Sequence, residues 1–525
     1  MLLLEINNLQ HYVKDRILLD IEQLQVHSGD CIGLVGRNGS GKTTLLDLIM
    51  RAQDGSNSIV VKASYELLPQ LKDTNTTKSG GEVTQEYINR ALANKADLLL
   101  ADEPTTNLDT EHIEKVEHHL KRWSGALILV SHDRAFLDAL CTKIWEIEEG
   151  IVTEYKGNYS DYARFKEMER QKQDNAYEQY VRKKKQLEEA LILKEQKAQR
   201  ATKKPKKTSL SEAKITGAKP YFANKQKKLR KAAKAIETRL EKLEKVEKRK
   251  DLPDVKMALP NEEDFKGRTV LRVNNLHGVI GKRVLWENAN FSVKGGDKLA
   301  IIGKNGSGKT TLIKKIMKVE PNISISPAVK IGYFSQNLDI LDNDRTILDN
   351  VQSSSLQTES FIRTVLARLH FFRDEVYKPV HVLSGGERVK VAFAKLFVSD
   401  INTLILDEPT NFLDIYAVEA LESLLQEYEG TVIFVSHDRR FIESIANRIL
   451  SIEEQVITVF EGTYEEYRNY EPQSERDMME DQLLLLETKI SDVLSRISIE
   501  PSEELEQEFQ QLLQEKRTLE RDNRK

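Results

Sequence analysis

Two nine-residue segments have the glycine-rich pattern that binds phosphate: GRNGSGKTT at residues 36–44 and GKNGSGKTT at residues 303–311. In this pattern backbone N–H groups converge on phosphate oxygens at the start of a helix, the lysine meets the outer phosphates, and the threonine after it ligates Mg²⁺. A structural glycine turn is the alternative for either copy alone, but two copies at equivalent places exclude coincidence. The candidate residues are Gly36, Arg37, Asn38, Gly39, Ser40, Gly41, Lys42, Thr43 and Thr44 in the first copy and Gly303, Lys304, Asn305, Gly306, Ser307, Gly308, Lys309, Thr310 and Thr311 in the second.

Each phosphate loop is followed by an apolar run that ends in two adjacent carboxylates. LLLADEP spans residues 98–104 and LILDEP spans residues 404–409. Two acids at a surface turn are usually only solvated, but acids that end a buried strand in a chain with a phosphate loop suit phosphoryl transfer. A histidine in SHD ends a third apolar run in each half of the chain. The candidates are Asp102 and Asp407 for Mg²⁺ through its water shell, Glu103 and Glu408 for orienting the attacking water or accepting its proton, and His132 and His437 for contact with the γ-phosphate.

These motifs belong to an internal repeat. The phosphate loops lie 267 residues apart, LLLADEPTTNLD at 98–109 matches TLILDEPTNFLD at 403–414, and ALILVSHDRAFLD at 126–138 matches TVIFVSHDRRFIE at 431–443. Short apolar runs alternate with helical patterns in both copies, which predicts an α/β fold with a parallel sheet and with the chemistry at the carboxyl ends of its strands. We expect a first P-loop NTPase domain at residues 1–158, a linker at 159–267, a second P-loop NTPase domain at 268–470 and a C-terminal helical extension at 471–525.

The linker has the pattern of two charged helices that fold back on each other. Apolar residues at alternating steps of four and three predict a coiled-coil seam in the second helix, at Leu229, Ala233, Ile236, Leu240 and Leu243. The first helix has a weaker stripe, at Tyr177, Tyr180, Lys184, Leu187 and Leu191. The Pro- and Gly-containing segment between them would form the tip of an antiparallel hairpin, near residues 203–222.

The linker is also strongly basic. Residues 194–234 carry 15 Lys and Arg against 2 Glu, a net charge of +13, which fits a phosphate backbone, and RNA in the first place. A solvated helix face is the alternative for the charges, and packing inside the hairpin is the alternative for the aromatic pair at the tip. The candidate tip residues are Lys203, Lys204, Lys206, Lys207, Leu210, Ser211, Ile215, Thr216, Gly217, Ala218, Lys219, Tyr221 and Phe222. The segment 471–525 carries 8 basic and 15 acidic residues and is a net −7.

Composition narrows the class of protein. The chain has 525 residues, 31% of them charged, and no apolar run near the roughly 18 to 20 residues that cross a bilayer. The N-terminus has no signal-peptide pattern, and the two cysteines, Cys31 and Cys141, read as core residues in a reducing compartment. We therefore expect a cytoplasmic protein without a membrane span.

SGGE at residues 79–82 and 384–387 resembles the signature motif of ATP-binding cassette (ABC) proteins. Two cassettes without a membrane span, joined by a charged helical linker, resemble the ABC-F family, whose members act on ribosomes. The linker pieces KEQKAQRATKKPK and GAKPYFA, and SRISIEPSEELEQEFQ near the C-terminus, resemble the Vga group of antibiotic-resistance ABC-F proteins of Gram-positive bacteria.

The resemblance implies that ATP and Mg²⁺ bind between each phosphate loop and the signature of the other cassette, in a monomer whose cassettes pair within the chain. It adds Ser384, Gly385, Gly386 and Glu387 to the first site, with Gln70 and with Tyr12 against the adenine. It adds Ser79, Gly80, Gly81, Glu82 and Gln336 to the second site, where Val279 or Ile280 stands near the expected place of the adenine contact. Eight residues separate Gln70 from Ser79 but 47 separate Gln336 from Ser384, so we expect a shortened helical subdomain in the first cassette and unequal hydrolysis at the two sites.

The resemblance also implies a function. The closed, ATP-bound form would enter the E site of the 70S ribosome, and the linker tip would reach toward the peptidyl-transferase centre, shifting the P-site tRNA or 23S rRNA. There it would displace lincosamides, streptogramin A or pleuromutilins, and hydrolysis would release the protein. A housekeeping ABC-F translation factor is the main alternative. A transporter subunit or a DNA-repair ATPase is less favoured, because the shortened subdomain lacks a coupling surface for a transmembrane subunit and two cysteines cannot form zinc clusters.

Overall fold

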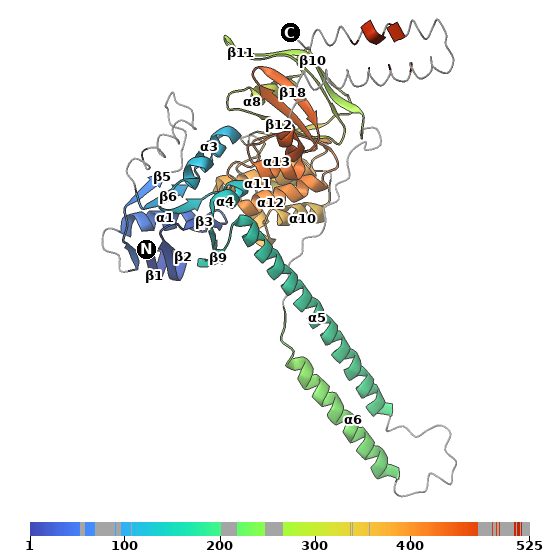
Figure 1. Cartoon of the computed structure of the whole chain (residues 1–525). Coiled ribbons are helices and arrows are strands. Elements are labelled where there is room, and N and C mark those ends of the chain that lie inside the picture. The colour runs from blue at the N-terminus through green and yellow to red at the C-terminus, as the bar shows by residue number, and fades with distance from the viewer. Residues whose placement is uncertain are drawn as a thin grey trace. The chain divides into compact units, whose positions relative to one another are not determined.

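A computed structural model describes most of the chain (Figure 1). The chain divides into two compact units, Met1–Glu461 and Gly462–Lys525. The described residues are 1–52, 58–68, 90, 96–106, 108–200, 218–246, 266–335, 338, 340–355 and 357–470, with short helical pieces at 486, 490, 493, 509–510, 512–514 and 516.

The first cassette is built on a nine-stranded sheet with the order β4-β1-β2-β9-β8-β3-β7-β6-β5. The strands β5, β6, β7, β3 and β8 run parallel, as the alternation of apolar runs and helices predicts, and an antiparallel β1–β2 hairpin joins them through β9. Their bounds are β1 Leu2–Val13, β2 Arg16–His27, β3 Cys31–Gly36, β4 Ile59–Val61, β5 Tyr65–Leu68, β6 Leu98–Asp102, β7 Ala126–Val130, β8 Lys143–Glu148 and β9 Ile151–Lys156.

The second cassette repeats this order in two pieces, β11-β10-β13 and β14-β15-β16-β12-β17-β18. In the first cassette strands β2 and β9 pair in parallel at Asp20 and Ile151, which makes one continuous sheet. At the equivalent place in the second cassette, between β11 and β18, the Glu287 N–H donates to the Gln455 carbonyl at 3.1 Å. The prediction of two tandem α/β P-loop domains is confirmed. The bounds are β10 Thr269–Ile280, β11 Arg283–Lys294, β12 Lys298–Gly303, β13 Ile323–Ile325, β14 Ile331–Phe334, β15 Thr403–Asp407, β16 Thr431–Val435, β17 Arg448–Glu453 and β18 Val456–Glu461.

Helices follow the strands at equivalent places in both copies. Aspartates cap four of them: the side chains of Asp109, Asp133, Asp414 and Asp438 each accept a hydrogen bond from a backbone N–H in the first helical turn, which fixes where the helix begins. Buried Leu, Ile and Val of the strands pack against these helices on both faces of the first sheet. The bounds are α1 Lys42–Arg51, α3 Thr110–Lys121 and α4 Arg134–Leu140 in the first copy, and α8 Lys309–Lys318, α12 Ile415–Glu427 and α13 Arg439–Ile445 in the second.

A helical subdomain lies between β14 and β15 of the second cassette. Its last helix begins with a capping box, in which the Ser384 side chain accepts from the Glu387 N–H and the Glu387 carboxylate accepts from the Ser384 N–H. The corresponding stretch of the first cassette, residues 69–89, lies outside the described residues, so its shortening stays a prediction. The elements are α9 Ile347–Gln352, α10 Glu359–Arg368, the 3₁₀ turns η3 Arg373–Tyr377 and η4 Val380–Val382, and α11 Gly385–Val398.

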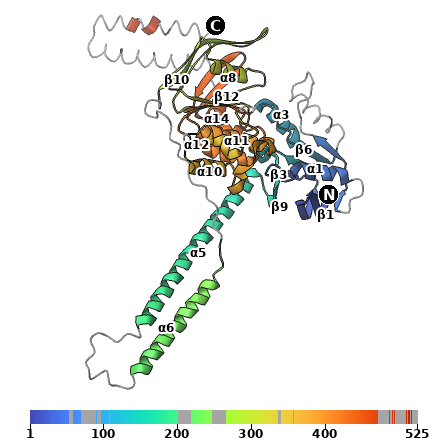
Figure 2. The ribbon, with the colours of Figure 1, turned by 180° about the vertical axis from the view of Figure 1, so that it is seen from behind.

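The linker contains helices α5 (Tyr159–Arg200) and α6 (Ala218–Glu241), which lie side by side in both views (Figures 1 and 2). The expected seam of α6 is its less exposed side, with Ala233 buried, whereas Lys184 in the expected stripe of α5 is exposed. Residues 203–217 of the predicted tip lie outside the described residues. Residues 218–222 belong to the first turns of α6, so this part of the expected tip is helical.

In the unit Gly462–Lys525 the described residues include helix α14 (Tyr464–Asn469) and the helical residues Leu486 and Val493, which are buried. Within the described ranges, no helix combines the length and the apolar character that a membrane crossing requires.

Candidate active sites

Both phosphate loops run from the end of a central strand into a helix. Gly41 and Gly308, with φ of 104° and 105°, occupy the position before α1 and α8, a left-handed conformation that favours glycine. The Lys42 ammonium folds back to donate to the carbonyls of Gly36 at 2.7 Å and Arg37 at 3.1 Å, and burial lowers its pKa. The Lys309 ammonium donates in the same way to the carbonyls of Gly303 at 2.8 Å and Lys304 at 3.1 Å. Each loop thus holds its cation close to the place where phosphate oxygens would bind.

The threonine after each lysine contacts the aspartate at the end of β6 or β15, which lies one strand beyond the neighbour of the strand that leads into the loop. The Thr43 hydroxyl donates to the Asp102 carboxylate at 2.9 Å, and the Thr310 hydroxyl donates to Asp407 at 3.2 Å. Burial raises the pKa of both aspartates. A hydroxyl beside a carboxylate offers the hard oxygen ligands that Mg²⁺ takes, so these residues fit the ion.

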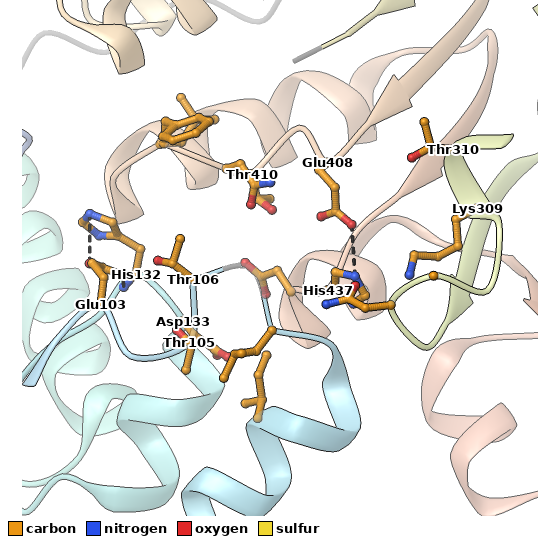
Figure 3. Close-up of a pocket in the computed structure, with 18 of the residues that line it drawn as sticks. Glu103, Thr105, Thr106, His132, Asp133, Lys309, Thr310, Glu408, Thr410 and His437 are labelled. Atoms are coloured by element: carbon orange, nitrogen blue, oxygen red, sulfur yellow. Dashed lines mark hydrogen bonds and ion pairs between the residues drawn. The ribbon is translucent and has the colours of Figure 1, made fainter. Parts of the chain in front are cut away.

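Glu103 and His132 form a buried pair in the first cassette (Figure 3). The backbone of Glu103 is left-handed, with φ of 50°, and its N–H donates to the Val130 carbonyl at 2.9 Å. The His132 Nε2 lies 3.3 Å from one oxygen of the Glu103 carboxyl, and the His132 N–H donates to the other at 3.3 Å. Burial raises the pKa of Glu103 to about 8 and lowers the pKa of His132 to about 3. Without nucleotide, the acid therefore holds a proton near neutral pH and the imidazole is neutral.

The second cassette repeats the pair with Glu408 and His437. Glu408 also has φ of 50°, its N–H donates to the Val435 carbonyl at 3.0 Å, and its carboxyl oxygen lies 3.2 Å from the His437 Nε2. Burial raises the pKa of Glu408 to about 7 and lowers the pKa of His437 to about 3. The two pairs have the same geometry, and burial raises the pKa of both glutamates.

The first phosphate loop meets the second cassette at the loop before α12 and beside the first turn of the signature helix α11. The Asn38 N–H donates to Asp414 at 2.8 Å, and the Asn38 side-chain amide donates to the Phe412 carbonyl at 3.0 Å. A Cβ built on Gly386 would lie 2.9 Å from that amide nitrogen and 2.6 Å from the Phe412 oxygen, so glycine alone fits there. The sequence-predicted signature residue Gly386 and the opposite phosphate loop are therefore in contact.

The second phosphate loop meets the first cassette in a related way. The Asn305 N–H donates to Asp109 at 2.8 Å, and the Lys304 ammonium lies 2.6 Å from the Glu111 carboxylate. Asp109 and Asp414 stand at equivalent positions of the repeat, so both interfaces place a helix-capping aspartate on the opposite phosphate loop. The first signature, residues 79–82, and both glutamines, Gln70 and Gln336, lie outside the described residues.

A cleft of about 420 Å³ separates the two Glu–His pairs. Its walls include Glu103 and His132 from the first cassette and Lys309 from the second. Ile280, one of the two residues expected near the second adenine, also lines it. Tyr12 lies at the exposed end of β1, with 54% of its surface accessible, so its ring is free to stack on a flat ligand.

Sequence reasoning missed the ion pairs that join the cassettes. Arg134 donates to the Glu422 carboxylate through two nitrogens, and both side chains are buried. At the equivalent places of the repeat, Arg439 donates to Glu117 at 3.1 Å. The available signal was the arginine that follows SHD in both copies, together with a glutamate eight residues after each capping aspartate.

Comparison with known proteins agrees with this geometry. A family model described as "ABC transporter" matches residues 19–67 and 286–411. The chain is 33% identical over 559 aligned residues to the ribosome protection protein VmlR of Bacillus subtilis (strain 168), with 99% of each chain covered. It is 33% identical to the erythromycin resistance ATP-binding protein MsrA of Staphylococcus epidermidis, covering 85% of this chain and 96% of that protein. It is also 35% identical to ABC transporter F family member 5 of Arabidopsis thaliana, covering 80% and 59%.

Solved structures show the same fold at lower identity. The RNase-L inhibitor superposes with a TM-score of 0.57 at 17% identity, covering 89% of this chain and 91% of that one. The archaeal ribosome recycling factor aABCE1, solved with the stalk protein aP1, gives a TM-score of 0.57 at 18% identity, covering 88% and 91%. At these identities the likeness supports the tandem-cassette fold alone.

Proposed function

This chain belongs to the ABC-F family of tandem ATP-binding cassette proteins, and from that membership we propose that it protects ribosomes from antibiotics in an ATP-driven cycle. Its cassettes make it an ATPase. The observation that carries the proposal is the similarity to a ribosome protection protein across 99% of both chains, linker and C-terminal segment included. A protein that shared only the cassettes would match over a smaller part of its length.

In the proposed cycle each ATP is held between a phosphate loop and the other cassette. Lys42 and Lys309 contact the outer phosphates, and Gly386 brings the second signature against the first loop. Mg²⁺, when bound beside Thr43 and Thr310, neutralises phosphate charge. ATP thereby supplies the differential affinity that favours the closed pair of cassettes.

Hydrolysis then uses the buried Glu–His pairs. Once deprotonated in the ATP-bound site, Glu103 and Glu408 orient the attacking water and accept its proton, and each neutral histidine holds its glutamate by the contacts of 3.2 to 3.3 Å. We expect the first signature, Ser79 to Glu82, to complete the second site in the way that Gly386 serves the first. Opening after hydrolysis releases the protein from its target.

The proposed target is the E site of the 70S ribosome, with the linker tip directed at the peptidyl-transferase centre. The net charge of +13 between residues 194 and 234 supports binding to 23S rRNA and to the P-site tRNA. The proposed effect is displacement of lincosamides, streptogramin A or pleuromutilins, with residues 203–222 as the effector. A cytoplasmic location follows from this target.

The test is expression in a drug-sensitive Gram-positive host, measuring inhibitory concentrations for a panel of these drugs. We expect at least a fourfold rise for one class with the wild-type chain and none with Glu103→Gln, Glu408→Gln, which should instead remain on ribosomes in ATP during sucrose-gradient sedimentation. Ribosome binding without any change in susceptibility would favour a housekeeping translation factor. A double variant that stays at the top of the gradient would overturn the cycle.

A further inference from the structure

A buried carboxylate joins three parts of the molecule behind the first phosphate loop. Glu146, on β8 of the first cassette, is 2% exposed. It accepts hydrogen bonds from the hydroxyls of Tyr162 at 2.6 Å and Tyr416 at 2.7 Å, and from the Lys166 ammonium at 2.9 Å. Tyr162 and Lys166 belong to the first turns of the linker helix α5, whereas Tyr416 belongs to α12 of the second cassette.

The bonds keep this carboxylate ionised. Burial alone would raise the pKa of Glu146, but the hydrogen bonds from Tyr162, Tyr416 and Lys166 and the charge of Lys166 lower it below its ordinary value. A buried charge that loses a close donor is left partly unsatisfied, so this network depends most on its three shortest hydrogen bonds, from Tyr162, Tyr416 and Lys166. Separation of Tyr416 from Glu146 should therefore loosen the first turns of α5, which bind the same carboxylate through Tyr162 and Lys166.

The first turn of α12 contacts both the phosphate loop and the linker base. Asp414 accepts from the Asn38 N–H, and two residues later the Tyr416 ring lies under the Arg37 guanidinium, 5.9 Å from its carbon. Ile415, between them, packs in the core cluster that contains Tyr162. One short segment thus contacts the loop that holds phosphate and the helix that carries the linker.

Two more contacts hold the same end of α5. The Tyr159 hydroxyl donates to Glu419 of α12 at 3.1 Å. The Arg440 guanidinium, from α13, donates to the Ser160 hydroxyl at 2.8 Å and to Asp138 of the first cassette at 2.9 Å. Helices α12 and α13 of the second cassette therefore both bear on the first turn of the linker.

The repeat does not reproduce this arrangement at the second site. Glu111 stands where α12 has Tyr416, and it pairs with Lys304 at 2.6 Å and Lys115 at 2.8 Å. Ser451 stands where β8 has Glu146, and its hydroxyl contacts the Thr458 hydroxyl at 2.7 Å. The carboxylate and the tyrosine that contacts it across the interface are thus features of the first site.

We propose that Tyr416 and Glu146 are positioning residues that couple the first ATP site to the linker: closure around ATP at Lys42 clamps the first turns of α5, whereas the equivalent positions of the repeat, Glu111 and Ser451, lack this tyrosine–carboxylate pair. This rests on the ATP-driven closure proposed above. The direction of the effect is that ATP at the first site rigidifies residues 159–166, and opening releases them.

The test is hydrogen–deuterium exchange of the full chain with Mg²⁺ and a non-hydrolysable ATP analogue. Two peptides are followed, residues 36–42 of the phosphate loop and residues 159–166 of the linker base. In the wild type the analogue should slow exchange in both peptides, by about tenfold in the linker base. In Tyr416→Phe the phosphate loop should remain protected, whereas the slowing in the linker base should shrink to within twofold.

Tyr155→Phe is the matched control. The Tyr155 hydroxyl donates to the same carboxylate at 3.2 Å, but Tyr155 lies on β9 within the first cassette, so its removal costs a bond to Glu146 without crossing the interface. This variant should keep the analogue-dependent slowing of residues 159–166. Glu146→Gln, which preserves shape and removes the charge, should behave like Tyr416→Phe.

Four results would overturn the coupling. If the analogue still slows exchange of residues 159–166 in Tyr416→Phe, the Tyr416 hydroxyl does not couple the site to the linker. If the slowing is lost in Tyr155→Phe as well, the cause is a general loosening around Glu146 and not the contact across the interface. If the analogue fails to protect residues 36–42 of the wild type, the first ATP site itself is wrong and the coupling has no input. If those residues are protected and the linker base of the wild type is not, the proposed ATP site stands and only the coupling fails.

Discussion

Replacement of Gly386 by alanine tests the contact between the signature helix and the opposite phosphate loop. The new Cβ would lie 2.6 Å from the Phe412 oxygen and 2.9 Å from the Asn38 amide nitrogen, against 3.4 to 4 Å for ordinary contact. The loop must therefore retreat by several tenths of an ångström. Retreat breaks the 3.0 Å bond from the Asn38 side chain and stretches the 2.8 Å bond from its N–H to Asp414.

The magnitude follows from those two bonds. A neutral hydrogen bond contributes about 1 kcal/mol and one to a charged group about 1.5 to 3 kcal/mol, so the closed interface should lose about 2 to 4 kcal/mol. This corresponds to a shift of about 30- to 700-fold in the closing equilibrium. Helix α11 should gain up to about 1 kcal/mol, because alanine favours a helix over glycine, but the clash with the Phe412 carbonyl lies inside the second cassette and offsets this gain.

The assay is amide exchange of Asn38 in the nucleotide-free chain, together with the melting temperature. Gly386→Ala should speed exchange of the Asn38 amide and lower the melting temperature, because the new Cβ also meets the Phe412 carbonyl within the second cassette. Gly385→Ala is the matched control, because it alters the neighbouring position of the same helix, where a Cβ would meet nothing within 4 Å in this structure. Unchanged exchange in Gly386→Ala, or an equal rise in both variants, would refute the steric argument.

Three other predictions follow from the interfaces and the Glu–His pairs. Glu422→Gln should weaken cassette pairing by about 3 to 5 kcal/mol, because it leaves the buried Arg134 with only the more distant Asp438 carboxylate, at 3.9 Å. The equivalent Glu117→Gln should cost less, since Glu117 is more exposed; urea denaturation compares the two variants, and equal losses would contradict this. The hydrogen bonds from the N–H groups of Asn305 and His112 outweigh burial and lower the pKa of Asp109 from 3.8 to about 2. The contribution of Asp109 to folding stability is therefore present above about pH 4 and is lost as the pH falls toward 2. The difference in melting temperature between the wild type and Asp109→Asn should shrink from about pH 5 to about pH 3, and a constant difference would argue against this reasoning. Glu103→Gln and Glu408→Gln should lower steady-state ATP hydrolysis by different factors, because the two sites are built from different neighbours, and equal losses would sink that idea.

The sequence predicted the parts of the site that local chemistry determines. A phosphate loop needs glycines at fixed spacing, and the threonine and aspartate that face each other at 2.9 Å follow from parallel strands that end at the same edge of a sheet. The left-handed backbone of Glu103 and Glu408 was not predictable, because a glutamate gives no sign of positive φ. It arises where the chain turns from β6 or β15 into the next loop.

Contacts between distant segments were beyond the sequence pattern. Glu146 lies within KIWEIE, where alternation marks it only as one more strand residue, and Tyr416 is 270 residues away in a helix that reads as amphipathic. Tyr162 lies just past the expected end of the first domain at residue 158, and its sequence position gave no hint of a hydrogen bond. Their meeting depends on the pairing of the two cassettes, which only the folded chain displays.

The length of α5 gives small movements at its base a large effect. The helix runs for 42 residues, or about 63 Å at 1.5 Å per residue, and only its first turns are held by Glu146 and its partners. A rotation at the base of the helix is therefore amplified along its length: each degree of tilt at Tyr162 moves the far end of α5 by about 1 Å. A change of less than about 1 Å in a hydrogen bond at the base becomes a displacement of several ångströms at the other end. The distances between a few buried atoms around Glu146 therefore determine the direction in which α5 points.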